Sequence, residues 1–180
     1  MSCVRANEQP IDTATVIVVR RATAADVARL AELSEILGYP VASSSLGPRL
    51  ERLLARVEDA VLVAEAESGV VGWVHGAEQE LLESGRRCEI LGLVVDPAYR
   101  SQGVGRRLVT AVERWAVNRG LEQMTVRSNV ARAESHPFYQ RLGYIRTKTQ
   151  HAYRKALSGA PSPGGAAPSH GHPVHQFPLA

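Results

Sequence analysis

The sequence is poor in cysteine and in aromatic residues, and it has no long apolar run. Its 180 residues include only Cys3 and Cys88 as cysteines, which excludes a disulfide framework and a four-cysteine zinc site. Aromatic residues make up 5% of the chain, too few for a surface that stacks on nucleic-acid bases. No apolar run approaches the ~18 residues of a membrane span, and residues 1–14 lack the apolar centre of a signal peptide. We therefore expect a cytoplasmic protein with no membrane partner.

A large excess of charge of one sign is also missing. The 21 basic residues are offset by 18 acidic ones and are interspersed with them, for a net charge of +3. Because a nucleic-acid-binding protein more often carries a basic stripe, we expect no nucleic-acid partner. The shares of hydrophobic (44%) and charged (22%) residues are those of a globular chain and exclude a mainly disordered, collagen-like or coiled-coil protein.

The composition divides the chain into three parts. We expect a flexible leader over 1–14, a folded domain over 15–157 and a disordered tail over 158–180. The tail has no charged side chain and contains five of the ten prolines, so it cannot bury enough apolar surface to offset its ordering entropy. It also holds His170, His172 and His175, which could ligate a metal, but a solvated tail is the favoured interpretation. We expect no metal site.

Apolar periodicity and turn residues predict interleaved strands and helices. A helix after Thr23 starts at a capping-box-like pair with Asp26, and Ser68-Gly69 joins two strands as a hairpin. The expected helices cover about 24–37, 46–57, 103–118 and 138–142. The expected strands are 15–20, 60–66, 70–77, 89–96 and 123–129, with a short final pair at 144–149 and 151–157. This order predicts an α/β (or α+β) fold with a mixed sheet.

The sharpest local motif is Arg100-Ser101-Gln102-Gly103-Val104-Gly105-Arg106-Arg107, which follows one strand and opens the long helix. Glycine lets the backbone turn tightly and direct several N–H groups to one point. The helix N-terminus adds about half a positive charge, so the turn suits a phosphate or pyrophosphate. The patterns of a P-loop and of a Rossmann dinucleotide site are both absent. The alternative is a plain helix start whose glycines serve packing.

Two segments carry a family resemblance. The run EILGLVVDPAYRSQGVGRRLVTAVERWA (89–116) resembles the acyl-CoA-binding segment of the GCN5-related N-acetyltransferases, the GNAT superfamily, with Arg100, Gly103 and Gly105 in the family's pattern. The second segment, Ser128-Asn129 followed by HPFYQRLGY (136–144), is similar to the family's strand end and aromatic-Tyr-x-x-Leu-Gly-aromatic helix end. The resemblance covers about 16–157 and is to the prokaryotic branch that acts on small substrates.

The resemblance implies a mixed, mostly antiparallel sheet that splays at the acyl-CoA site and carries helices on both faces. It implies acetyl-CoA as cosubstrate and no metal. The main chain of 93–95 would bind the pantetheine arm, and the glycine turn would bind the pyrophosphate. The implied cofactor-binding residues are Leu93, Val94, Val95, Arg100, Ser101, Gln102, Gly103, Val104, Gly105, Arg106, Asn129, Arg132 and His136. Some of these have ordinary alternatives: Leu93 and Val95 as core residues, and Arg132 and His136 as solvated helix residues.

The resemblance also implies catalytic residues. Tyr139 would give its phenolic proton to the departing thiolate, and Glu89 would take the proton of the amine through water. The alternatives are a half-buried tyrosine with a satisfied hydroxyl and an exposed strand carboxylate. His136 and Glu134 are the other candidates for the base.

The implied function is transfer of an acetyl group from acetyl-CoA to a primary amine by direct attack in a ternary complex. The acceptor is a small-molecule or peptide amine, and the loops 38–48 and 76–88 would form its wall, with Glu78, Glu80 and Glu83 available to attract a cation. Since dimers are common in the family, a homodimer is an open alternative to a monomer. Two other functions stay open. One is a non-catalytic acyl-CoA-binding regulatory module of the same fold, and the other is an arginine-rich nucleic-acid-binding module.

Overall fold

The computed structural model describes residues 16–132, 134–155 and 157. The expected leader over 1–14 and the expected tail over 158–180, with its three histidines, lie outside these residues. The chain divides into two compact units, with the boundary after Ile145. Within 16–132, 134–155 and 157, no helix combines the length and the apolar character needed to cross a membrane.

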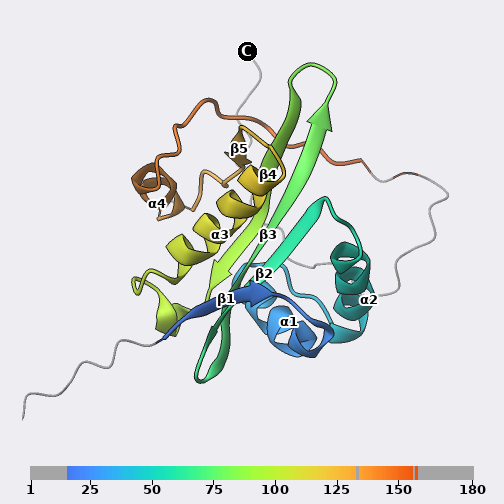
Figure 1. Cartoon of the computed structure of the whole chain (residues 1–180), viewed down its shortest axis with the longest axis vertical. Helices are drawn as coiled ribbons and strands as arrows, with labels where there is room; N and C mark the ends of the chain where they lie inside the picture. Colours follow the sequence, from blue (N-terminus) through green and yellow to red (C-terminus); the bar gives the residue numbers. More distant parts are fainter. Residues whose placement is uncertain (1–15, 133, 156, 158–180) are drawn as a thin grey trace, which may run out of the picture. The chain divides into compact units, whose positions relative to one another are not determined.

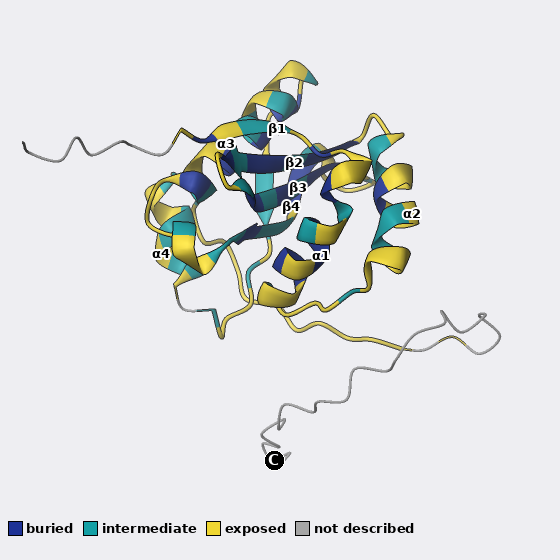
Figure 2. Cartoon of the chain, turned by 90° about the horizontal axis from the view of Figure 1, so that it is seen from below, coloured by how far each residue is buried: buried dark blue, intermediate teal, exposed yellow. Residues whose placement is uncertain are grey.

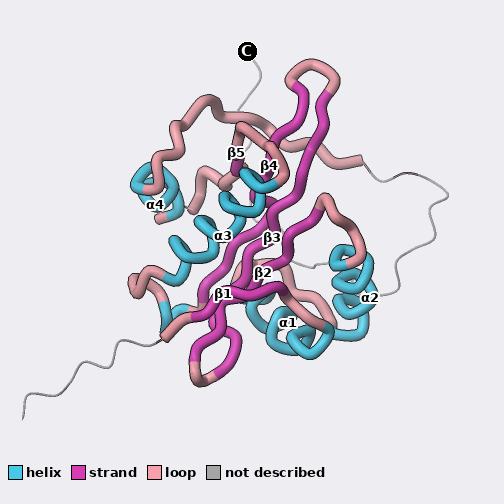
Figure 3. Tube along the Cα trace, in the orientation of Figure 1, coloured by secondary structure: helices cyan, strands magenta, loops and turns pink. Residues whose placement is uncertain are grey.

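A five-stranded sheet forms the centre of the first unit, in the order β1-β2-β3-β4-β5 (Figures 1 and 3). The strands are β1 (Val18–Arg21), β2 (Asp59–Ala66), β3 (Gly69–Leu81), β4 (Gly85–Val95) and β5 (Met124–Val126). The first four pair antiparallel, and β5 joins β4 in parallel. The sheet is therefore mixed and mostly antiparallel, as the sequence predicts.

Helices cover both faces of this sheet, which also agrees with the prediction (Figure 2). The first face carries α1 (Val27–Ile36) and α2 (Ser43–Leu54), and the second carries α3 (Val104–Asn118) and α4 (Ser135–Arg141). In α1 and α3 the aliphatic residues recur three or four positions apart, so each of these helices buries an apolar stripe. In α1 the stripe includes Leu30 and Leu33, and in α3 it includes Val104, Leu108 and Val112.

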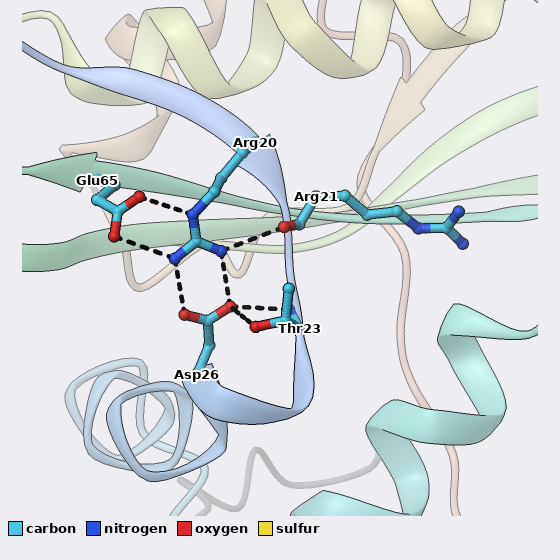
Figure 4. Close-up of polar contacts among 5 residues, drawn as sticks. All are labelled: Arg20, Arg21, Thr23, Asp26 and Glu65. Atoms are coloured by element: carbon cyan, nitrogen blue, oxygen red, sulfur yellow. Dashed lines mark hydrogen bonds and ion pairs between the residues drawn. The ribbon is translucent and has the colours of Figure 1, made fainter.

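Ion pairs hold the start of α1 against the sheet edge (Figure 4). Arg20 on β1 donates two hydrogen bonds to Asp26, at 2.8 and 2.9 Å, and two to Glu65 on β2, at 2.7 and 3.2 Å. The Asp26 carboxylate also accepts a hydrogen bond of 2.8 Å from the main-chain N–H of Thr23. A capping box needs this hydrogen bond, so the predicted pair of Thr23 and Asp26 is confirmed. Hydrogen bonding from Arg20 lowers the pKa of Asp26 below its usual range.

The hairpin of β3 and β4 is longer than predicted. The polar interval at 78–88 was expected to connect two strands, but it continues the ladder on both sides of a turn at Leu82-Glu83-Ser84. Glu78 accepts hydrogen bonds from Arg86 at 2.6 Å and from Arg119 of α3 at 2.8 Å. A cross-strand ion pair stabilises this extension where apolar alternation is missing, so hydropathy alone did not indicate it.

The sheet opens beside the middle of β4. A bulge shifts the register so that His75 pairs with Gly92 and Gly76 with Ile90, which leaves Leu91 as the extra residue. On the other side of β4, β5 pairs only with residues 88–90. From Leu91 onward β4 therefore has no strand along this edge in the described structure, which confirms the predicted splay.

The predicted pair of final strands at 144–149 and 151–157 is wrong. The structure records no strand over 144–155, and the side chains of Ile145 and Tyr153 are 87% and 92% exposed. A β-branched or aromatic residue favours a strand only where it packs on a pleated, half-buried surface. Ile145 and Tyr153 are of types that favour strands, but neither side chain is buried against a sheet.

Candidate active site

The glycine turn links the end of β4 to the start of α3. A short 3-10 helix, Pro97–Tyr99, leads into it, and Ser101 and Gly103 both have positive φ, at 61° and 80°. Arg107 donates its main-chain N–H to the carbonyl of Gly103 at 3.1 Å, which closes the first helical turn. The preceding N–H groups lack intrahelical acceptors, as at every helix N-terminus. The turn therefore presents main-chain N–H groups without intrahelical acceptors at the positive end of α3.

The two glycines of the turn have different roles. Gly103 adopts a left-handed conformation, and a Cβ there would meet no atom within 4 Å. Gly105 lies under α4, where a Cβ would stand 3.2 Å from two ring atoms of Phe138. Gly103 thus permits the turn, and Gly105 permits close packing between α3 and α4. The packing alternative applies to Gly105 but not to Gly103.

A pocket of about 180 Å³ lies where β4 and β5 diverge. Its lining comes from four places: the end of α1, the middle of β4, the end of β5 with the loop that follows, and α4. The lining residues are Leu37, Tyr39, Ile90, Leu91, Gly92, Leu93, Val126, Arg127, Ser128, Asn129, Arg132, Ser135, Phe138 and Tyr139. The splay of the sheet thus creates a cavity that contacts both faces of the fold.

Tyr139 lines this pocket from α4, next to the residue that packs on the glycine turn. Its ring makes edge-to-face contacts with Phe138 and Tyr144, at centroid distances of 5.1 and 5.6 Å. Burial raises the pKa of Tyr139 to about 12, with Arg132 opposing the effect. The hydroxyl is therefore protonated throughout the physiological pH range and available as a donor.

Glu89 lies on β4 but does not line the pocket. Its carboxylate is buried, with the residue 3% exposed, and accepts hydrogen bonds of 2.6 and 3.0 Å from Nε and Nη2 of Arg127. The pairing raises the pKa of Arg127. The exposed-carboxylate alternative for Glu89 is therefore wrong. Arg127 itself was not singled out from the sequence, because its partner is 38 residues away and depends on the register of β5 against β4.

The loop after β5 brings Asn129 and Arg132 to the pocket lining, and the predicted His136 lies on α4 outside that lining. Asn129 accepts a hydrogen bond of 2.9 Å from the N–H of Ala131, and its carbonyl contacts His136 Nε2 at 3.2 Å. Arg132 donates a hydrogen bond of 2.6 Å to the carbonyl of Leu37 at the end of α1. Arg132 thus spans the gap from the loop to the face of the sheet that carries α1.

The predicted acidic wall is absent from the lining of the pocket. Glu78 pairs with Arg86 and Arg119 near α3, and Glu80 and Glu83 are not pocket residues. Of the described residues that line the pocket, none is Asp, Glu or His. Within the described ranges, no group of three or more His, Cys, Asp or Glu could hold a metal ion.

The comparisons with known proteins agree with one another, because the family profile and the two sequence relatives reported below are acetyltransferases. The profile of the "Acetyltransferase (GNAT) family" matches residues 27–144. An aminoglycoside N(6')-acetyltransferase type 1 of Stenotrophomonas maltophilia is 30% identical over 144 residues, which cover 77% of this chain and 93% of that protein. The acetyl transferase GW6a of Oryza sativa subsp. japonica is 29% identical over 147 residues, covering 74% of this chain and 34% of that protein.

Solved structures share the fold at low sequence identity. The aminoglycoside N-acetyltransferase AAC(6')-Iy in complex with CoA has a TM-score of 0.73 and 21% identity, over 82% of this chain and 99% of that one. A transcriptional regulator from Bacillus halodurans C-125 has a TM-score of 0.71 and 20% identity, over 78% and 100% of the two chains.

Proposed function

Because the chain belongs to the acetyltransferase (GNAT) family, as its two motifs predict, we propose that it acetylates the primary amine of a small molecule by direct attack in a ternary complex. Membership makes the chain an acyl-CoA-dependent N-acetyltransferase with acetyl-CoA as cosubstrate. One observation carries the proposal: Tyr139 lines the pocket at the splay of the sheet, and its neighbour Phe138 packs on Gly105 of the glycine turn.

Acetyl-CoA would lie along the open edge of β4. The N–H groups at the turn and at the start of α3 would hold its pyrophosphate, with charge supplied by Arg100 and Arg106. The main-chain edge of 91–95, which β5 does not cover, would bind the pantetheine arm, since buried strand N–H and C=O groups need partners. Arg100 Nε already donates a hydrogen bond of 3.3 Å to the carbonyl of Val95. The thioester would then reach the pocket beside Tyr139.

In the chemical step the amine nitrogen attacks the thioester carbonyl carbon. The C–N bond forms, the C–S bond breaks, and the nitrogen loses its extra proton. A main-chain N–H of β4 would stabilise the oxyanion, because a fixed donor is worth more in a site that excludes water. An ordinary thiol has a pKa of about 8.5, so it is a stronger acid than a phenol of pKa about 12. We therefore assign Tyr139 a hydrogen bond that strengthens as charge builds on the sulfur.

The amine must be neutral when it attacks. Since no Asp, Glu or His stands among the described pocket-lining residues, we propose that its proton leaves to water. Glu89, whose carboxylate is held by Arg127, then acts as a positioning residue for Arg127 in place of the predicted base. On this account the rate rises with pH toward the pKa of the amine.

Cys88, the one cysteine among the described residues, does not support an acyl-enzyme intermediate. Cys88 is fully buried, and burial raises the pKa of its thiol to about 11. The reactive form of a cysteine is the thiolate, so a thiol of this kind is a poor nucleophile. This favours direct transfer.

The test is a measurement of CoA thiol release from acetyl-CoA with a panel of primary amines. The proposal expects amine-dependent thiol release and an N-acetylated product of the same stoichiometry by mass spectrometry. Tight acetyl-CoA binding without thiol release for any amine would support the non-catalytic regulatory module instead.

A further inference from the structure

Among the described residues, the lining of the pocket carries two arginines and no acidic residue, and one of the arginines, Arg127, is paired with Glu89 behind the lining. Arg127 and Arg132 are its only charged residues among those described, and they approach from the same loop region after β5. Several relatives are named aminoglycoside N-acetyltransferases, and an aminoglycoside is a compound with several amino groups. Such a polycation would meet two guanidinium groups here and no free carboxylate, and like charges in one site disfavour binding.

From this we propose that the acceptor is a compact primary amine that also carries a carboxylate, an amino acid in the broad sense. The inference rests on the proposed function and narrows its substrate class. The carboxylate of the acceptor would pair with Arg127, and its amine would face the thioester beside Tyr139.

Arg127 is arranged to hold a second carboxylate. A guanidinium has five N–H donors. The pair with Glu89 uses Nε and one N–H of Nη2, which leaves the opposite edge of the group for another acceptor. The Arg127 side chain is 75% exposed, whereas the Glu89 side chain is 4% exposed. The buried Glu89 thus fixes the position of the Arg127 guanidinium, while the N–H groups that Glu89 does not use stay accessible. A planar guanidinium can bind a carboxylate through two parallel hydrogen bonds.

Arg132 supplies the second positive charge and closes the site toward α1. Its bond to the carbonyl of Leu37 fixes one end of the guanidinium at the wall that carries Tyr39. Residues 38–48, which connect α1 to α2 and form the first turns of α2, contain three serines and no acidic residue, so they offer no partner for a polycation.

The experiment compares matched acceptors by thiol release. Glycine, β-alanine, 4-aminobutyrate and the standard amino acids are each paired with the amine in which hydrogen replaces the carboxylate, and kanamycin serves as the polycation. We expect kcat/KM to be at least tenfold higher for the best amino acid than for its decarboxylated partner, and higher than for kanamycin. Equal or better turnover of kanamycin or of the decarboxylated amines would overturn the inference while leaving the proposed function intact. If acetyl-CoA binds but no amine releases thiol, both fail.

A variant identifies the group responsible. Arg127→Lys keeps the charge that Glu89 requires but loses the planar fork, so we expect KM for the amino acid to rise about tenfold with the Kd of acetyl-CoA unchanged. Arg114→Lys, at an exposed position on α3 outside the pocket, is the matched control. A preference for the carboxylate that survives in Arg127→Lys, or a loss that is equal in the control, would count against Arg127 as its origin.

Discussion

Gly105 and Phe138 are in direct contact: a Cβ on the glycine would lie 3.2 Å from the aromatic ring. The contact joins the two sequence motifs, which are separated by more than thirty residues. Since Tyr139 follows Phe138 on α4, the glycine turn and the phenol belong to one packed unit. If the turn binds pyrophosphate as we propose, helix packing would set the distance from the pyrophosphate to the hydroxyl.

The turn itself is tested by Gly103→Val. A β-branched residue is strained at φ 80°, and its side chain would crowd a phosphate on the adjacent N–H groups. We expect the protein to fold and acetyl-CoA binding to be lost in isothermal calorimetry. The matched control is Gly120→Val at the other end of α3, where φ is 71° and an added Cβ would meet no atom within 4 Å. This control should lower the stability of the protein about as much as Gly103→Val does, with the affinity for acetyl-CoA unchanged. If Gly103→Val bound acetyl-CoA with wild-type affinity, the turn would not be part of the binding site.

The hydroxyl is tested by Tyr139→Phe, which keeps the ring and its edge-to-face contacts. Removing one hydrogen-bond donor to charge that develops in the transition state costs about 10²–10³-fold in kcat, so we expect kcat to fall by that factor with the Kd of acetyl-CoA unchanged. Tyr144→Phe is the control, because the Tyr144 hydroxyl bonds to Glu113 at 3.1 Å and lies outside the pocket lining. A loss below about tenfold in Tyr139→Phe would show that the hydroxyl is dispensable.

Glu89→Gln separates a base from a positioning residue. A base would show a drop in kcat of about 10²-fold or more and an altered pH profile. If Glu89 positions Arg127, KM for the acceptor should rise while kcat falls less than tenfold, and the rate should still increase with pH toward the pKa of the amine. Steady-state kinetics between pH 6 and 9 distinguish the two results, and the first would restore Glu89 as the base.

The ion pair of Arg20 and Asp26 predicts a pH dependence of stability. The folded pKa of Asp26 is depressed, chiefly by the hydrogen bond from Arg20. Its contribution is therefore present above the unfolded pKa of about 3.9 and is lost as pH falls through the folded value. In urea unfolding near pH 7, Asp26→Asn should cost about 2 kcal/mol, and the cost should shrink below pH 4. Glu67→Gln in the exposed β2–β3 turn is the control, and an equal effect there would argue against the pair.

Local patterns were enough for most of the fold. The stripe of Val104, Leu108 and Val112 predicts α3, and the Ser68-Gly69 turn predicts the β2–β3 hairpin, because each depends on residues close together in the chain. The glycine turn and the Phe138-Tyr139 motif were also predictable from the sequence, since short backbone motifs are encoded locally. The final strands were not predictable in this way, because residue type indicates a strand only when a partner surface exists.

The sequence by itself therefore determined the local motifs: a glycine turn after a strand, the helix that follows it, and a tyrosine on a later helix. The pairing of Glu89 with Arg127, the reach of Arg132 to Leu37 and the absence of an acidic wall are properties of the assembled fold. They depend on strand register and on helix packing between residues 38 to 95 positions apart. Such contacts arise from the summed burial of the whole core, so no local pattern contains them.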